Sequence, residues 1–253
     1  TLTLFPYTTL FRSQMFGINA ELLIDHAWGY ESCTIAQIRA YKPQSSSLGC
    51  GQVLHCPYTA DKARIVVQEM IDGISLELVE KRLVTDQLVL TVGYDIENLT
   101  RPEIRKVYKG PVTTDRYGRR VPKHAHGTWN LPRATSSSSE LLEAMAALYD
   151  KIVNPALLIR RMSLSACHVV NEKMAKEREQ KETFEQLDLF TDYAKKEAKE
   201  KEEQKKRERE RRMQEALLTI KKKYGKNAVL RGMNFEEGAT AKERNGQIGG
   251  HQA

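Results

Sequence analysis

Residues 87–94, QLVLTVGY, decide the fold of this chain, because apolar and polar residues alternate along them. Alternation with a period of two places apolar side chains on one face of a β-strand and the remaining side chains on the other face. A strand with one apolar face needs a packing layer against that face. Amphipathic helices are therefore expected in the sequence around it.

A helix is predicted immediately before this strand. Thr59 is its expected N-cap, and the helix runs to about Leu83. Its apolar side chains recur at helical spacing: Ala63, Val66, Val67, Met70, Ile71, Ile74 and Val79. A short strand is predicted within residues 48–55. The first half of the folded region thus has the order strand, helix, strand.

A second unit of the same kind follows. Residues 123–131, KHAHGTWNL, alternate again, and Ser137-x-x-Glu140 is a capping box for a second helix that ends at Asn154-Pro155. This helix has an apolar side: Leu141, Leu142, Met145, Leu148 and Ile152. Residues 158–170 form the last strand. The two units predict an α+β domain at residues 47–171, a split βαβ (βαββαβ) fold with a four-stranded antiparallel sheet and two helices on one face.

Such a sheet has a free face, and the sequence predicts its chemistry. If Met162, Leu164 and Ala166 point toward the helices, the residues between them point away. The predicted free face carries Arg161, Ser163 and Ser165 from the last strand, with His124, His126, Thr128 and Asn130 from the third. Hydroxyls, imidazoles and a guanidinium without an aromatic pair favour phosphate contact over base stacking. The two histidines alone do not make a metal site, because no Cys or carboxylate completes one.

The connection between the second and third strands, taken to be the central ones, adds basic residues. These are Arg101, Arg105, Lys106, Lys109, Arg116, Arg119 and Arg120, against only Glu103 and Asp115. A cluster of this sign predicts contact with a polyanion. The alternative is a solvated loop beside a polar sheet exterior, and composition alone does not separate the two.

Composition limits the class of protein. The chain has 253 residues with 40 Lys and Arg against 33 Asp and Glu, and its isoelectric point is near 9.1, which points toward nucleic acid. It contains no run of 18 or more apolar residues, so no membrane partner is expected. The four cysteines lack C-x-x-C spacing and are typical of a reducing, cytoplasmic environment. No metal, cofactor or small-molecule substrate is predicted for these residues.

The two ends differ from the middle. Residues 3–13, TLFPYTTLFRS, resemble a translated sequencing adapter, so residues 1–13 are excluded from the fold and the natural protein is expected to continue upstream of Gln14. Residues 14–30 contain a short helix with an unpartnered apolar face, and residues 31–46 have linker composition. Residues 193–253 form a charged helical or disordered extension. It has a short amphipathic turn at Met213, Leu217, Ile220 and Tyr224, and a tail too polar to form a core.

Residues 186–190, QLDLF, lie where the folded composition gives way to the charged run. Leu187, Leu189 and Phe190 are suited to anchoring an extended peptide in a partner's apolar pocket, with Gln186 supplying amide hydrogen bonds. The alternative is an apolar patch that folds back on its own domain.

Several of these segments, in order, look like the C-terminal half of a Y-family DNA polymerase, closest to the UmuC-like translesion enzymes of Gram-positive bacteria. They are FGINAELLIDHAWGYE at 16–31, GQVLHCPY at 51–58, VTDQLVLTVGYD at 84–95, KHAHGT at 123–128, LIRRM at 158–162 and GATAKERNGQIGGH at 238–251. The resemblance implies the end of a thumb domain at 14–30 and a linker at 31–46. It also implies a DNA-gripping little finger domain at 47–171 and a linker with a clamp-binding peptide at 172–192.

By this resemblance Arg160 and Arg161 contact phosphates of a duplex template–primer, and Gln186, Leu187, Leu189 and Phe190 bind the bacterial sliding clamp. The charged extension becomes a tether between the two. The family polymerises with palm carboxylates that hold Mg²⁺, and no segment here matches that palm. The residues given are therefore expected to bind DNA and clamp in DNA repair by translesion synthesis, and not to polymerise alone.

Two other classes of function remain open on the sequence. A stand-alone RNA-binding adaptor with the same sheet would need exposed aromatic residues on its central strands, where the sequence offers chiefly Trp129 on the apolar side. A helical scaffold built on residues 172–222 would need to self-associate, although sustained heptad positions are missing.

Overall fold

The structure is a computed structural model that describes residues 14–17, 19–41, 46–115, 117–175, 177, 193–248 and 251–252. The chain divides into two compact units, Thr1–Gln44 and Ser45–Ala253. The first unit holds helices α2 (Asn19–Ala27) and α3 (Ile35–Ala40). Helix α3 lies within residues 31–46 and begins with a capping box, in which the Thr34 hydroxyl accepts from the Gln37 amide at 3.3 Å.

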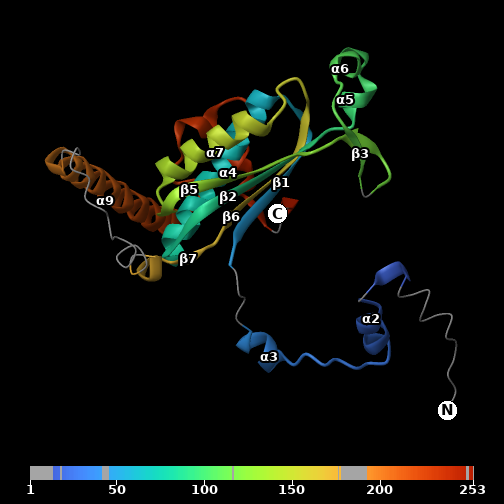
Figure 1. The fold of residues 1–253 in the computed structure, drawn as a ribbon, viewed down its shortest axis with the longest axis horizontal. Coiled ribbons are helices and arrows are strands. Elements are labelled where there is room, and N and C mark those ends of the chain that lie inside the picture. The colour runs from blue at the N-terminus through green and yellow to red at the C-terminus, as the bar shows by residue number, and fades with distance from the viewer. Residues whose placement is uncertain are drawn as a thin grey trace. The chain divides into compact units, whose positions relative to one another are not determined.

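The second unit is built on an antiparallel sheet covered by two helices (Figure 1). Its main elements are β1 (Leu48–Tyr58), α4 (Ala60–Lys81), β2 (Leu83–Tyr94), β5 (Ala125–Thr135), α7 (Ser138–Ile152) and β6 (Ile159–Cys167). The predicted α+β order of two strand–helix–strand units is confirmed. A further short strand, β7 (Val170–Asn171), pairs with the start of β2 and makes the sheet five-stranded.

The prediction that the second and third strands are central is wrong for the third. The sheet order is β1-β6-β2-β5, so β5 lies at an edge and the last long strand, β6, lies inside. In this order β6 separates β1 from β2, and β2 separates β5 from β6. Each helix crosses over one intervening strand, an arrangement that alternation along single strands does not specify.

The core lies between this sheet and helices α4 and α7. Leu88, Leu90, Met162, Leu164 and Ala166 are fully or almost fully buried on the helix-facing side of the two inner strands. The predicted alternation of β6 is thus confirmed.

Of the two predicted helix caps, one forms in part and the other makes no side-chain hydrogen bond. The Ser137 hydroxyl accepts from the Glu140 amide at 3.3 Å, but the Glu140 carboxylate pairs with Arg133 and Arg207 and does not complete the box. Thr59 stands at the N-cap of α4 without a side-chain cap hydrogen bond.

The connection from β2 to β5 forms a small lobe at one end of the sheet (Figure 1). It consists of α5 (Glu97–Thr100), α6 (Pro102–Val107) and the hairpin of β3 (Val112–Thr114) and β4 (Arg120–Pro122). Asn98 ties it to the sheet, because its side chain donates to the Leu158 carbonyl and accepts from the Leu158 amide, at 2.8 and 2.7 Å. We call this part the basic lobe.

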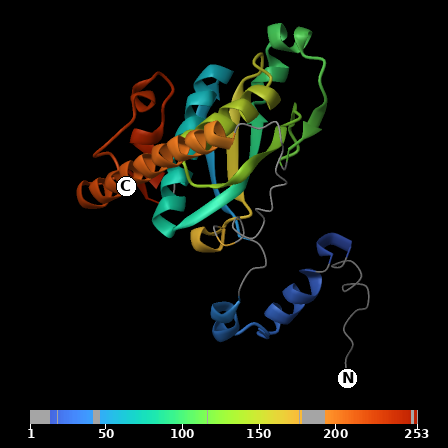
Figure 2. The ribbon, with the colours of Figure 1, turned by 60° about the vertical axis from the view of Figure 1, so that its left-hand side comes forward.

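The charged extension is a 32-residue helix, α9 (Tyr193–Tyr224), which packs against α4 and the start of α7 (Figure 2). Its contact is polar. Glu210 accepts from the Ser139 amide at 2.8 Å and from the Ser137 hydroxyl at 2.7 Å, which places a carboxylate at the N-terminus of α7. Gln214 is buried and donates to the Ser136 carbonyl and the Ser138 hydroxyl.

Three of the four residues of the predicted amphipathic turn are exposed: Met213, Tyr224 and Ile220, at 52, 68 and 37%. The fourth, Leu217, is partly buried. The face that docks carries Arg207, Glu210, Arg211, Gln214, Leu218 and Lys221, which recur every three or four residues. A polar docking face leaves no hydrophobic period in the sequence.

The tail after α9 is polar, as predicted, but it packs on α4 through one buried carboxylate. Glu69, only 3% exposed, accepts from the Thr240 and Ala241 amides at 2.9 Å each, from the Asn234 side chain at 2.8 Å and from the Thr240 hydroxyl at 3.2 Å. Two of these donors begin the short helix α10 (Ala241–Arg244).

An ion pair and a hydrogen bond hold the tail at two further points. Arg231 pairs with Asp72 at 2.8 Å, and burial raises the pKa of Asp72 while Arg231 opposes that rise. Arg244 donates to the Gln52 side chain on β1 at 2.6 Å. In the part of the chain that the structure describes, none of the helices combines the length and apolar composition that crossing a bilayer requires.

We expect Glu69→Ala to release the tail, because it leaves four donors without their shared acceptor. The loss should lower the free energy that holds the tail on α4 by about 3 kcal/mol. Burial raises the pKa of the nearby Cys50 thiol to about 11, so in the native protein this thiol reacts slowly with iodoacetamide. The variant should show faster hydrogen exchange at residues 232–246 and faster alkylation of Cys50. Glu143→Ala, at an exposed carboxylate of α7, is the control. Equal exchange in both variants would contradict the role given to Glu69.

Candidate nucleic-acid interface

The face of the sheet opposite the helices is mainly polar. One row across it runs from Gly51 on β1 through Ser163 on β6 and Thr91 on β2 to His126 on β5. The next row is Gly49, Ser165, Val89 and Thr128. Both rows consist mainly of small or hydroxyl-bearing residues, so a broad ligand can approach the backbone of all four strands.

Arg161 lies across this face at one end of the rows. It pairs with Gly93 on β2 and Val53 on β1. A Cβ atom at Gly93 would lie 2.5 Å from both Cγ and Nε of Arg161, so the guanidinium chain occupies the space that the glycine leaves. A similar close approach occurs at Gly49, where a Cβ atom would lie 2.9 Å from the Ser165 hydroxyl. Glycines on the neighbouring strands thus make room for the polar side chains of β6.

The neighbouring Arg160 is at an irregularity of β6, where the register with β1 and with β2 shifts. Its guanidinium lies 3.7 Å from the Asp95 carboxylate and donates to the His55 carbonyl at 3.0 Å. Both arginines thus lie between the buried Ile159 and Met162, and Arg161 is the more exposed of the two. Their joint contact with phosphate stays a prediction.

The predicted histidines and hydroxyls share one region. His126 and Thr128 are exposed on β5, and the His126 Nδ1 atom lies 2.9 Å from the Thr91 hydroxyl. His124 is exposed just before β5, in the connection from the basic lobe. Gln87 and Asn130 extend the face by a side-chain hydrogen bond of 2.9 Å. Within the described residues, this face carries no Phe, Tyr or Trp, since Trp129 points toward the helix side.

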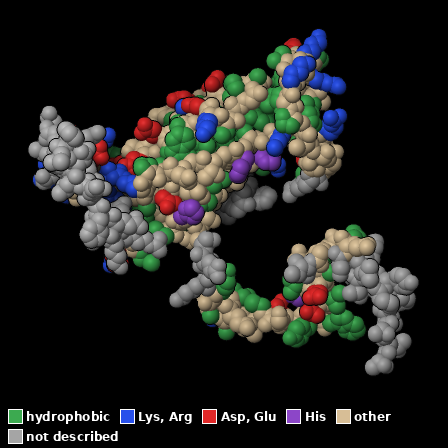
Figure 3. Space-filling view, viewed as in Figure 1, with side chains coloured by type: hydrophobic (Ala, Val, Ile, Leu, Met, Phe, Trp, Pro, Cys, Tyr) green, Lys and Arg blue, Asp and Glu red, His purple; other side chains and the backbone are tan. Residues whose placement is uncertain are grey.

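The basic lobe supplies further cations beside the free face, and Lys and Arg side chains gather over α5 and α6 in Figure 3. Arg119 is held by Asp115 at 2.8 Å, and its hydrogen bonds hold the pKa of that carboxyl below its usual range. Arg120 is exposed on β4, opposite Thr114. Arg116 lies outside the described residues. The other cations of the predicted basic cluster, Arg101, Arg105, Lys106 and Lys109, are also exposed on the lobe.

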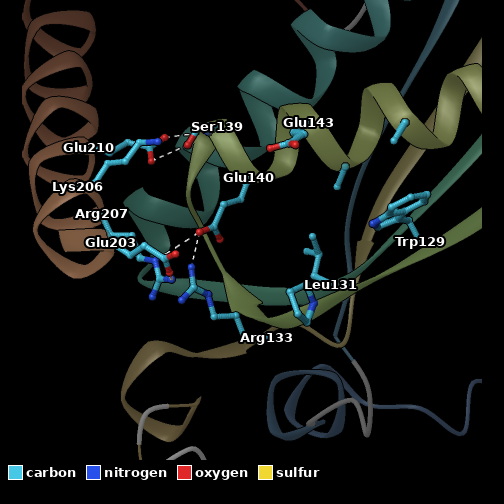
Figure 4. Close-up of a pocket in the computed structure, with 13 residues that line it drawn as sticks. Trp129, Leu131, Arg133, Ser139, Glu140, Glu143, Glu203, Lys206, Arg207 and Glu210 are labelled. Atoms are coloured by element: carbon cyan, nitrogen blue, oxygen red, sulfur yellow. Dashed lines mark hydrogen bonds and ion pairs between the residues drawn. The ribbon is translucent and has the colours of Figure 1, made fainter. Parts of the chain in front are cut away.

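A hollow of about 740 Å³ lies elsewhere in the second unit, between β5, α7 and α9 (Figure 4). Trp129 and Leu131 form an apolar part of its wall. At one end Glu140 pairs with Arg133 and, at 3.4 Å, with Arg207. This groove is on the helix side of the sheet. No sequence pattern indicated it, because it forms only when α9 docks.

The predicted clamp-binding residues, Gln186, Leu187, Leu189 and Phe190, lie outside the described residues. The chain enters that segment near β7 and leaves it at the start of α9. Their role stays a prediction.

No protein-family model and no curated protein matches this chain. Among solved structures, it is similar to a chain of a structure described as "Complex of beta-clamp processivity factor and little finger domain of PolIV". The two share 9% sequence identity with a TM-score of 0.32, and the match covers 58% of this chain and 100% of that chain.

Proposed function

We propose that residues 47–171 grip duplex template–primer DNA through its phosphates, and that residues 186–190 bind a bacterial sliding clamp. The chain would then be the DNA- and clamp-binding portion of a Y-family translesion polymerase, acting in DNA repair in the cytoplasm. The sequence resemblance suggests this function. The observation that carries the DNA part is the mainly polar free face, on which Arg161 lies over Gly93 beside rows of hydroxyls.

The chemistry of this face suits a phosphate backbone. Hydroxyls, imidazoles and a guanidinium hydrogen-bond phosphate oxygens and carry no base code. Glycines at the β1 end of both rows, Gly49 and Gly51, keep that side of the face open to a wide, rigid ligand. The cations of the basic lobe extend the positive surface past the end of the sheet.

The RNA-adaptor hypothesis has less support. Single-strand RNA readers of this topology stack bases on aromatic side chains of the sheet. The described free face offers hydroxyls and glycines at those positions. The scaffold hypothesis also has less support, because α9 packs on its own domain.

Duplex binding should be independent of sequence and should weaken with salt. Each phosphate contact contributes about −0.9 to the slope of log K against log salt concentration. Arg161→Gln should therefore make the slope shallower by about that amount. The control is Lys151→Gln, which removes an equal charge from the exposed side of α7. Titration of a fluorescent duplex at several salt concentrations measures both. A slope that Arg161→Gln leaves unchanged would count against the proposal.

Gly93→Ala should weaken DNA binding without touching a charge. The new methyl group takes the space of the Arg161 side chain, which must leave its position on the face. Gly51→Ala is the matched control, since its nearest neighbour would be 3.6 Å away, an ordinary contact. We expect a several-fold larger loss of duplex affinity for Gly93→Ala than for Gly51→Ala, with both proteins folded by circular dichroism. Equal losses would show that the position of Arg161 does not matter.

The clamp part is tested separately. Leu189→Ala/Phe190→Ala should reduce the affinity for a bacterial sliding clamp by about 100-fold or more, because two buried apolar anchors are lost. Glu185→Ala/Thr191→Ala changes the flanks of the same segment and should bind as the unmodified chain does. Surface plasmon resonance on immobilised clamp gives the comparison. Retained binding in the first variant would exclude this peptide as the contact.

A further inference from the structure

A mainly apolar pocket opens in the basic lobe, apart from the free face. It has a volume of about 410 Å³ and is formed by α6 together with the turn that comes after α7. Ile104, Val107, Tyr108 and Leu157 give it an apolar wall, and Asn154 and Lys109 are polar groups in its lining. Its volume falls in the range of about 300–1,000 Å³ that is usual for small-ligand sites.

The pocket is held in shape by its own contacts. The Tyr108 hydroxyl donates to the Pro111 carbonyl at 2.8 Å. Its ring lies over Gly110, where a Cβ atom would come within 2.6 Å of the ring carbons. Leu157 is buried at the base, with 2% exposure, whereas Val107 at the rim is 73% exposed. A partly open pocket with a fixed aromatic wall is therefore available to a flat apolar group.

The surroundings indicate the charge of the ligand. Arg105, Lys106 and Lys109 are exposed on or next to α6, against one acid, Glu103, in the pocket lining. A ligand with an apolar flat part and a negative part fits this combination. A nucleobase attached to its phosphate has both.

The pocket also adjoins the predicted DNA contacts. A second depression shares Tyr108, Gly110, Asn154 and Leu157 with it and continues to Lys123 and His124. His124 stands at the entry to β5, whose exposed residues belong to the free face. A strand leaving a duplex on the free face could thus reach the pocket along a surface lined by Lys123.

We propose that this pocket binds an unstacked nucleobase of the single-stranded extension that adjoins the duplex, with its phosphates held by the lysines and arginine on or next to α6. This deepens the proposed function and rests on it. The base stacks beside the Tyr108 ring and makes apolar contact with Val107 and Ile104. The phosphates supply the part of the binding free energy that depends on salt concentration.

The experiment compares a blunt duplex with the same duplex carrying a five-nucleotide single-stranded extension. The extension should raise the affinity about tenfold, a moderate value for one base stacked on a protein side chain. Val107→Glu should abolish that gain, because it places a negative charge at the rim of the pocket, and it should lower the affinity for the blunt duplex by a smaller factor. Met213→Glu is the control, since it adds the same charge at an exposed apolar residue on α9.

A second readout locates the base. The fluorescent base analogue 2-aminopurine is placed at each position of the extension in turn, and one position should change its emission on binding in the unmodified protein and not in Val107→Glu. The proposal is overturned if the extension adds no affinity, or if Val107→Glu weakens blunt and extended duplexes equally. Failure of the proposed function is a different result, namely that the blunt duplex itself is not bound.

Discussion

The structure depends on one constraint, that the inner strands of the sheet bury every second side chain. Leu88, Leu90, Met162 and Leu164 are held under α4 and α7, so the residues between them are forced to the opposite face. That face has no covering layer among the described residues. Its chemistry is therefore free to serve a ligand, and the same alternation that makes the core also lines up the hydroxyls in rows.

Local periodicity in the sequence predicts much of this domain. The alternation of β2 and β6 indicated the strands, the buried face and the residues of the free face, and helical spacing indicated α4 and α7. Strand order could not be predicted, because two strand–helix–strand units can interleave in more than one way with the same periodicity. The register shift at Arg160 could not be predicted from alternation either. It places two residues, Arg160 and Arg161, between the buried Ile159 and Met162.

The features that the sequence missed depend on contacts between distant polar residues. In the sequence, Glu69 looks like any helix carboxylate. It is buried and hydrogen-bonded because residues 234–241 pack against it in the folded protein. The same holds for Gln214 and Glu210 on α9. The pocket beside α6 likewise needs Leu157, which lies far from Val107 in the chain. Such partners have no common period and no short motif.

The polar docking of α9 has a consequence for the whole second unit. The ion pairs of Arg211 with Glu172 and of Lys222 with Glu80 fix the helix to the domain partly by charge, whereas the core under the sheet is held by apolar burial. Ionic strength weakens the first kind of contact and leaves the second nearly intact. The domain and its long helix are thus two layers of different salt sensitivity. A rise in salt would therefore loosen the helix from the domain before it affects the core under the sheet.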